Sequence, residues 1–203
     1  MLACAALALA TIALPTLTVR VHVAKDVPSV LVRYVLDEAV ATWAASGITL
    51  SLSQESADVD DVAYPGAVVV VTIDDDPPAK PGELLPLGWI PFDQLSRPQG
   101  RIHLSFSNAW TLLRDTRGAE AIRMTLAERN RLLGRALGRA LAHELGHYLL
   151  ESRAHASTGL MKTGRSGTEF FSERSDAFVL PPEGRMLIAG RLPALVTAVA
   201  SAR

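Results

Sequence analysis

The sequence predicts an α+β fold, in which a long helix and a small helical C-terminal part accompany a twisted mixed sheet of about five strands. Five short stretches have the alternating or β-branched pattern of strands, and two longer stretches repeat apolar residues at helical spacing. With 203 residues, 49% of them hydrophobic, the chain is long enough to bury one substantial core. We therefore expect a single domain.

The first half of the chain predicts three strands and one helix. Residues 18–23 read Thr-Val-Arg-Val-His-Val, the period-2 alternation of a half-buried strand. Residues 28–46 carry apolar side chains three and four positions apart and are followed by Gly47, as expected of an amphipathic helix. Residues 48–52 alternate again, and residues 67–73 form a β-branched run that suits a strand covered on both faces.

The middle of the chain predicts two further strands and the longest helix. Residues 87–92 are short and aromatic and include a proline, which suits an edge strand because proline has no N–H to donate to a ladder. Residues 101–106 alternate as a fifth strand, and a connection through Trp110 and Gly118 follows. Residues 125–150 carry leucines mostly four positions apart, so we expect a long helix there.

The remainder of the chain predicts a loop and one terminal helix. A Gly/Ser/Thr-rich stretch follows Met161 and is expected to be a loop. The Pro181–Pro182 pair is then expected to interrupt regular secondary structure. The last helix is expected to start near Met186, or later with Pro193 in its first turn.

Composition and charge narrow the classes of function. The chain has 20 Lys plus Arg, 21 Asp plus Glu and a formal net charge of −1, so nucleic acid is not an expected partner. The single cysteine forms no intramolecular disulfide and no Cys-x-x-Cys pair, so a metal site must use His and carboxylates. No uncharged apolar run approaches the roughly 20 residues of a spanning helix, so no stable membrane span is expected.

The N-terminus has a signal-like apolar segment within residues 1–15, followed by the expected domain at residues 16–203. Residues 2–14 form an uncharged Ala/Leu run with the length of a secretory h-region, although no basic n-region precedes it. We expect a secreted or periplasmic protein. An Ala-rich helix packed on the domain is the alternative. Lipid anchoring through Cys4 is not expected, because such a cysteine follows an apolar run and this one opens it.

The sequence His143-Glu144-Leu145-Gly146-His147 is an HExxH motif in the last part of the predicted long helix. At about 100° per residue, His143 and His147 lie about 40° apart and one turn from each other, so both imidazoles can reach one zinc ion. Glu144 lies beside that face, where its carboxylate can take a proton from a water on the metal. The motif predicts a Zn²⁺ site with Glu144 as the general base.

These residues resemble the metzincin-type zinc metallopeptidases, the group of the matrixins and their small bacterial relatives. Residues 142–150 (AHELGHYLL) are similar to the active-site helix of that group, and residues 158–161 (TGLM) are similar to its Met-turn. The resemblance covers the active-site region and the order of the elements. It implies a metzincin-like (zincin) fold, Met161 beneath the metal, and residues 87–92 as the edge strand that lines the cleft.

The third ligand departs from the metzincin pattern. Metzincins place a glycine three residues, and a third histidine six residues, after the second histidine; this chain has Leu150 and Arg153 there. His155 comes two residues later, and we predict it as the third ligand. The alternative is a gluzincin-like site in which Glu169 or Glu173 supplies a carboxylate ligand.

The activity implied is that of a zinc-dependent metalloendopeptidase acting on a peptide or protein substrate through a metal-activated water. The predicted edge strand could hold an extended peptide as an additional strand. A non-catalytic zinc-binding module would keep the same histidines. Glu144 argues against it, because a purely structural site needs no base and closes its fourth position with a protein ligand. A metal-free binding domain would make the three histidines coincidental.

Overall fold

The structure is a computed structural model that describes residues 18–23, 27–53, 68–74 and 86–201. The apolar run at residues 2–14, on which the prediction of export depends, lies outside the described residues. Within the described ranges, no helix has both the length and the apolar character needed to cross a bilayer.

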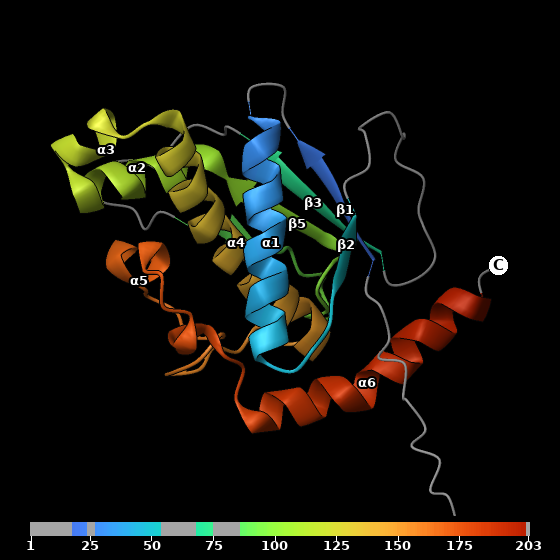
Figure 1. Ribbon diagram of the computed structural model, residues 1–203. Coiled ribbons are helices and arrows are strands. Elements are labelled where there is room, and N and C mark those ends of the chain that lie inside the picture. Colours follow the sequence, from blue (N-terminus) through green and yellow to red (C-terminus); the bar gives the residue numbers. More distant parts are fainter. Residues whose placement is uncertain (1–17, 24–26, 54–67, 75–85, 202–203) are drawn as a thin grey trace, which may run out of the picture.

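The strands form one mixed sheet in the order β2-β1-β3-β5-β4 (Figure 1). Their bounds are β1 Thr18–Val23, β2 Ser51–Ser53, β3 Val68–Asp74, β4 Gly88–Trp89 and β5 Arg101–Ser105. The strands β2, β1, β3 and β5 run parallel, and β4 pairs antiparallel with β5 at the edge. The stretch predicted at residues 87–92 is thus an edge strand, although only two of its residues belong to β4.

Two long helices cover one face of the sheet, and together with it they confirm the predicted α+β class. They are α1 (Ser29–Ala45) and α4 (Leu126–Leu150), which pack against each other (Figure 1). A Cβ atom on Gly134 would lie 2.3 Å from Cβ of Tyr34, and one on Gly138 would lie 2.6 Å from the carbonyl oxygen of Val35. Glycine therefore permits the close approach of α1 and α4.

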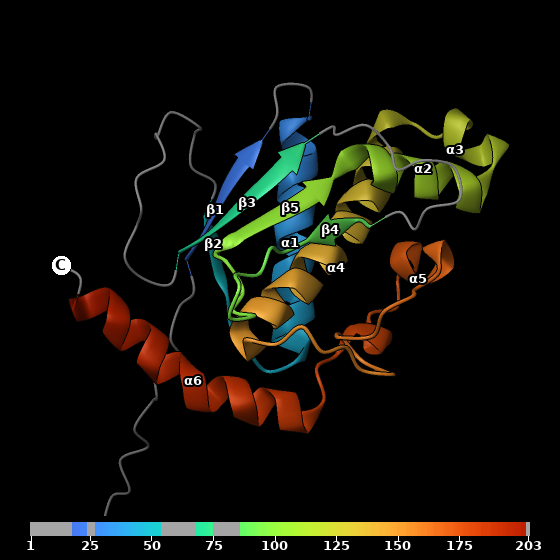
Figure 2. The same cartoon turned by 180° about the vertical axis from the view of Figure 1, so that it is seen from behind.

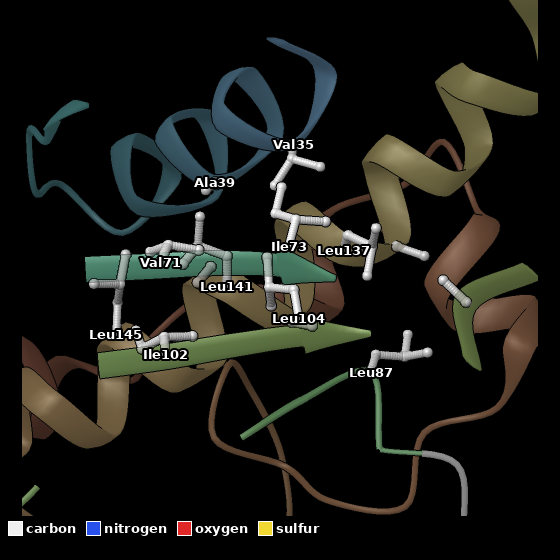
Figure 3. Close-up of a cluster of buried hydrophobic side chains, with 14 of the residues drawn as sticks. Val35, Ala39, Val71, Ile73, Leu87, Ile102, Leu104, Leu137, Leu141 and Leu145 are labelled. Atoms are coloured by element: carbon white, nitrogen blue, oxygen red, sulfur yellow. The ribbon is translucent and has the colours of Figure 1, made fainter. Parts of the chain in front are cut away.

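The core lies between these two helices and the sheet. Figure 3 shows leucines of α4 facing β3 and β5, with α1 side chains beside them. The fully buried members drawn there include Val35, Ala39, Val71, Ile73, Ile102, Leu104, Leu137, Leu141 and Leu145. Figure 2 shows the opposite face of the sheet, where no helix of the described residues lies.

The expectation that residues 67–73 are covered on both faces is wrong. Val69, Val71 and Ile73 are fully buried, whereas Val70 and Thr72 keep part of their surface exposed. The side chains of β3 alternate between the two faces, and the helices cover only one of them.

Two helices occupy the stretch that the sequence predicted as a connection: α2 (Phe106–Arg117) and α3 (Ala119–Arg123). The hydroxyl of Ser105 accepts a hydrogen bond from the Asn108 N–H at 3.3 Å, so α2 is capped directly at the end of β5. Gly118, at φ 55°, separates the two helices.

The C-terminal part is helical as predicted, with different boundaries. It contains α5 (Gly167–Phe171), the 3₁₀-helix η1 (Asp176–Phe178) and α6 (Pro182–Ser201). The loop expected after Met161 therefore includes α5, which starts with a capping box made by Ser166 and Glu169. The last helix starts at Pro182 and not near Met186, because proline fits the first turn of a helix, where its missing N–H is not needed.

Candidate metal centre

The helix α4 carries the HExxH residues in its last two turns. It starts with a capping box in which the Thr125 hydroxyl accepts from the Glu128 N–H and the Glu128 carboxylate accepts from the Thr125 N–H. Its leucines, four residues apart, are buried against the sheet. The packing of these leucines fixes the rotation of α4, and that rotation sets the direction of His143 and His147.

The chain reverses direction immediately after α4, at Glu151. This residue has φ 47° and ψ 45°. Helices commonly end with a residue in this left-handed conformation, and that residue is usually glycine. The Glu151 N–H donates to the Tyr148 carbonyl at 3.3 Å, and the Ser152 N–H donates to the His147 carbonyl at 3.2 Å. A non-glycine residue therefore makes the turn, one position later than the metzincin glycine, and the chain returns toward α4 with His155.

The three predicted histidines lie together. Nε2 of His147 is 3.2 Å from Nε2 of His143 and also 3.2 Å from Nε2 of His155. One ring nitrogen from each histidine falls within 4.8 Å of the other two. Two nitrogens bound to one tetrahedral zinc at 2.0 to 2.1 Å are about 3.3 Å apart, so the two 3.2 Å spacings match ligands of one zinc ion.

Backbone carbonyls fix the tautomers of two of these rings. Nδ1 of His143 lies 2.8 Å from the Leu160 carbonyl oxygen, and Nδ1 of His147 lies 2.6 Å from that of Ser152. Because a carbonyl only accepts, each Nδ1 carries the proton and each Nε2 presents a lone pair. Two lone pairs 3.2 Å apart repel each other unless a cation lies between them, so this donor set fits a metal ion.

Burial keeps the two helical histidines in the neutral form that binds metals. It lowers the pKa of His143 to about 4, although the hydrogen bond to Leu160 acts in the opposite direction. Burial also lowers the pKa of His147, of which only 4% is exposed. His155, by contrast, is exposed.

The turn containing Met161 packs against the part of α4 that carries the two histidines. Sδ of Met161 packs against Gly146, where an added Cβ would lie 2.3 Å from the sulfur. The Leu160 carbonyl holds His143, and the Met161 carbonyl accepts from the Ala156 N–H at 2.9 Å. The same turn therefore orients one histidine of α4 and anchors the residue that follows His155.

Glu144 lies between α4 and the edge strand β4. Only 8% of the residue is exposed, and a Cβ added to Gly88 of β4 would lie 3.4 Å from its Cγ. Burial raises the pKa of Glu144 to about 7, against the smaller opposing effect of the Ile90 backbone N–H. A carboxyl group with this pKa can both accept and release a proton near neutral pH.

The alternative carboxylate ligands lie outside the group of possible ligands found among the described residues. The Glu169 carboxylate binds Lys162 Nζ at 3.0 Å and accepts from the Ser166 N–H at the start of α5. Glu173 has a side chain that is 82% exposed and lies 3.9 Å from the Arg135 guanidinium. Neither carboxylate belongs to the histidine cluster: Glu169 pairs within its own segment and Glu173 lies near Arg135 of α4.

Sequence reasoning missed Arg165, whose buried side chain stabilises the Met161 turn. Its guanidinium donates to the Gly159 carbonyl, to the Ala177 carbonyl at 2.9 Å and to the Glu169 carboxylate at 3.2 Å. It also lies 4.0 Å from the centre of the Phe178 ring. An isolated arginine in a polar loop gives no sequence signal of such a role.

No protein-family model matches the sequence, and no curated protein sequence matches it. Solved structures do share its fold. Archaemetzincin from Methanopyrus kandleri superposes with a TM-score of 0.51 over 92% of this chain and 99% of that chain, at 11% sequence identity. A zinc-dependent peptidase from Methanocorpusculum labreanum superposes with a TM-score of 0.52 over 84% of this chain and 99% of that chain, at 14% identity.

Proposed function

We propose that this chain is a zinc-dependent metalloendopeptidase in which His143, His147 and His155 bind the metal and Glu144 is the general base. The observation that carries the proposal is the convergence of three imidazole nitrogens beside a buried carboxylate. The similarity in fold to two structures named as an archaemetzincin and a zinc-dependent peptidase supports it.

An open metal position favours catalysis over a structural role. A structural zinc site has four protein ligands, whereas a catalytic site has three and leaves a position for water. Within the described residues, the group of possible ligands has three members, and one of them, His155, is exposed to solvent. This arrangement argues against a non-catalytic zinc module.

Glu144 performs the proton transfers of the proposed reaction. Bound zinc would polarise the scissile carbonyl and lower the pKa of a coordinated water toward about 7. The Glu144 carboxylate accepts the proton of the attacking water and then donates it to the leaving amine. The raised pKa of Glu144 suits both steps, because the group exchanges a proton near neutral pH.

The edge strand β4 supports an extended peptide as the substrate. It is the last strand in the sheet order, so its outer edge can pair with another strand. Gly88 of β4 lies against Glu144 and brings a paired peptide past the carboxylate. Met161 beneath the histidines and His155 as the third ligand make the site metzincin-like.

The test compares the zinc-loaded parent with Glu144→Ala on an unfolded protein substrate. We expect both proteins to hold the same amount of zinc, and hydrolysis to fall by at least about a hundredfold in the variant, as general-base catalysis contributes that much. Glu120→Ala is the matched control, because its carboxylate is exposed on α3 and lies outside the cluster. Equal hydrolysis by the parent and Glu144→Ala would contradict the mechanism.

A further inference from the structure

Arg153 lies on the short segment that joins two of the candidate ligands. Before it, the Ser152 carbonyl accepts from Nδ1 of His147 at 2.6 Å. After it, the Ala156 N–H donates to the Met161 carbonyl at 2.9 Å. The main chain is thus anchored on both sides of Arg153, so the base of this side chain is fixed relative to the histidines.

The Arg153 side chain rests on an aromatic ring that contacts the cluster. Its guanidinium carbon lies 4.6 Å from the centre of the Phe92 ring. The Phe92 ring in turn meets His147 edge-on, with centres 6.1 Å apart and planes at 79°. Phe92 is itself held by an antiparallel bridge to Pro98 in the loop after β4.

The charge of Arg153 has no carboxylate partner among the described residues. The other arginine of this region, Arg97, pairs with Asp93 at 3.0 Å. The Glu151 carboxylate, two residues before Arg153, lies 3.9 Å from the Arg191 guanidinium instead. The exposed guanidinium of Arg153 therefore lies near the histidine cluster, and its contact with the Phe92 ring holds it in position.

This placement leaves the guanidinium ready to bind an anion. The contact with Phe92 uses the ring face and the carbon of the guanidinium, and the N–H donors remain for a planar, bidentate partner such as a carboxylate. Holding the side chain on the ring beforehand reduces the entropy lost when a ligand binds. A second cation, the metal, would strengthen the attraction for negative charge.

We propose that Arg153, seated on Phe92, forms a subsite for a substrate carboxylate. The proposal deepens the proposed peptidase function and rests on it. The guanidinium carbon lies 4.6 Å from the Phe92 ring centre, which lies 6.1 Å from the His147 ring centre. Since an extended peptide advances about 3.3 Å per residue, the subsite is within about three substrate residues of the histidine cluster. The chain would therefore select peptides with an acidic side chain, or a free C-terminal carboxylate, near the cleavage point.

Binding tests the subsite without hydrolysis. The zinc-loaded full chain carrying Glu144→Gln is titrated with fluorescent peptides that differ only by Glu or Gln at successive positions. A further pair ends in a free carboxylate or an amide. We expect about tenfold tighter binding of one carboxylate form, the size of a charge-assisted hydrogen bond. The pair that shows the preference identifies whether a side chain or a C-terminus supplies the carboxylate.

Substitution of the arginine assigns the preference to this site. Adding Arg153→Gln removes the preference, and Arg153→Glu reverses it. Arg123→Gln, the same change on the exposed surface of α3, keeps it. Equal binding of both peptide forms, or a preference that survives Arg153→Gln, would overturn the subsite.

Measurements of hydrolysis distinguish failure of the proposed subsite from failure of the proposed peptidase function. With Glu144 intact, we expect kcat/KM to follow the binding preference and the Arg153→Gln chain to cleave both peptide forms equally. Cleavage by the parent without any charge preference overturns the subsite alone. Absence of both binding and cleavage overturns the peptidase function together with it.

Discussion

The layer formed by the sheet, α1 and α4 differs in its stabilising interactions from the segment at residues 151–181. The layer is packed through fully buried aliphatic side chains such as Leu141 of α4 and Ile102 of β5 (Figure 3). The segment contains only the short helices α5 and η1. It buries a few apolar side chains, such as those of Phe171 and Leu180, and arginines donate hydrogen bonds to its carbonyl groups. The candidate site takes two histidines from the layer and the third from the segment.

Two buried arginines account for most of these polar contacts. Arg139 of α4 donates to the carbonyls of Glu169, Phe170 and Arg174, and its Nε lies 2.7 Å from the Glu38 carboxylate of α1. Arg165 ties the Met161 turn to η1. Apolar packing thus positions the helical ligands, while the segment that carries His155 depends in addition on directional hydrogen bonds from the two arginines. Changes in the two regions should therefore separate fold stability from metal binding.

The largest expected effect on stability comes from a cavity in the layer. Leu141→Ala removes a fully buried side chain and should lower the free energy of unfolding by about 3 kcal/mol. Urea unfolding measures this loss, and the folded fraction should still bind zinc like the parent. The control is Leu95→Ala, whose side chain is 72% exposed and should change stability by less than about 0.5 kcal/mol. Similar losses in both variants would argue against the core described.

Breaking the arginine contacts should affect metal binding more than Leu141→Ala does. Arg139→Met leaves three carbonyls and the Glu38 carboxylate without their donor, so we expect a loss of about 2 kcal/mol in stability. Zinc affinity, measured by competition with a chelator, should fall as well, because His155 belongs to the released segment. Arg174→Gln, with a side chain 83% exposed, is the control. Unchanged zinc affinity in Arg139→Met would show that His155 is positioned by other contacts.

The pH dependence of the zinc-free protein distinguishes Glu144 from its neighbouring histidines. Between pH 4.5 and 6.5 folded Glu144 keeps a proton that the unfolded chain releases, so its contribution to stability falls as pH rises. His143 and His147, with lowered pKa values, are neutral when folded and protonated when unfolded, so their contribution rises with pH.

Glu144→Gln removes the contribution of Glu144, which falls as pH rises, and leaves that of the histidines, which rises with pH. Stability of the zinc-free variant should therefore rise more steeply with pH in this window, by up to about 1.4 kcal/mol per pH unit relative to the parent. Urea unfolding at a series of pH values measures both slopes. Parallel profiles would mean that Glu144 is not protonated in the folded protein at acid pH.

The smallest expected effect tests the contact between the two regions at Gly146. Gly146→Ala places a Cβ 2.3 Å from Sδ of Met161, and the gain in helix propensity offsets part of the clash, so we expect a net loss of about 1 kcal/mol. In a Met161→Ala background the same change should stabilise the protein by about 1 kcal/mol. Thermal unfolding of the four proteins measures the cycle. The same sign in both backgrounds would contradict the contact.

The sequence predicted the layer better than the segment for a physical reason. Burial on one face leaves a periodic trace, as in the leucines of residues 125–150, whereas contacts with distant arginines leave none in residues 151–181. Outside both regions, the sequence predicts a connection where α2 lies, because this helix follows β5 without a separating turn. The pairing of Arg139 with Glu38 joins residues 101 positions apart and leaves no local pattern. The left-handed turn at Glu151 likewise has no glycine from which the sequence could predict it. His143, Glu144 and His147 were predictable because their geometry is contained in one helix.

The most direct test of the three-histidine site is the zinc content of the purified chain, measured by elemental mass spectrometry. The parent and Glu173→Ala should each hold about one zinc per chain, and His155→Ala should lose most of it, because two histidines alone bind zinc much more weakly than three. Full zinc in His155→Ala together with its loss in Glu173→Ala would contradict the account and restore a carboxylate as the third ligand. Absence of zinc from the parent after reconstitution would remove the metal centre altogether.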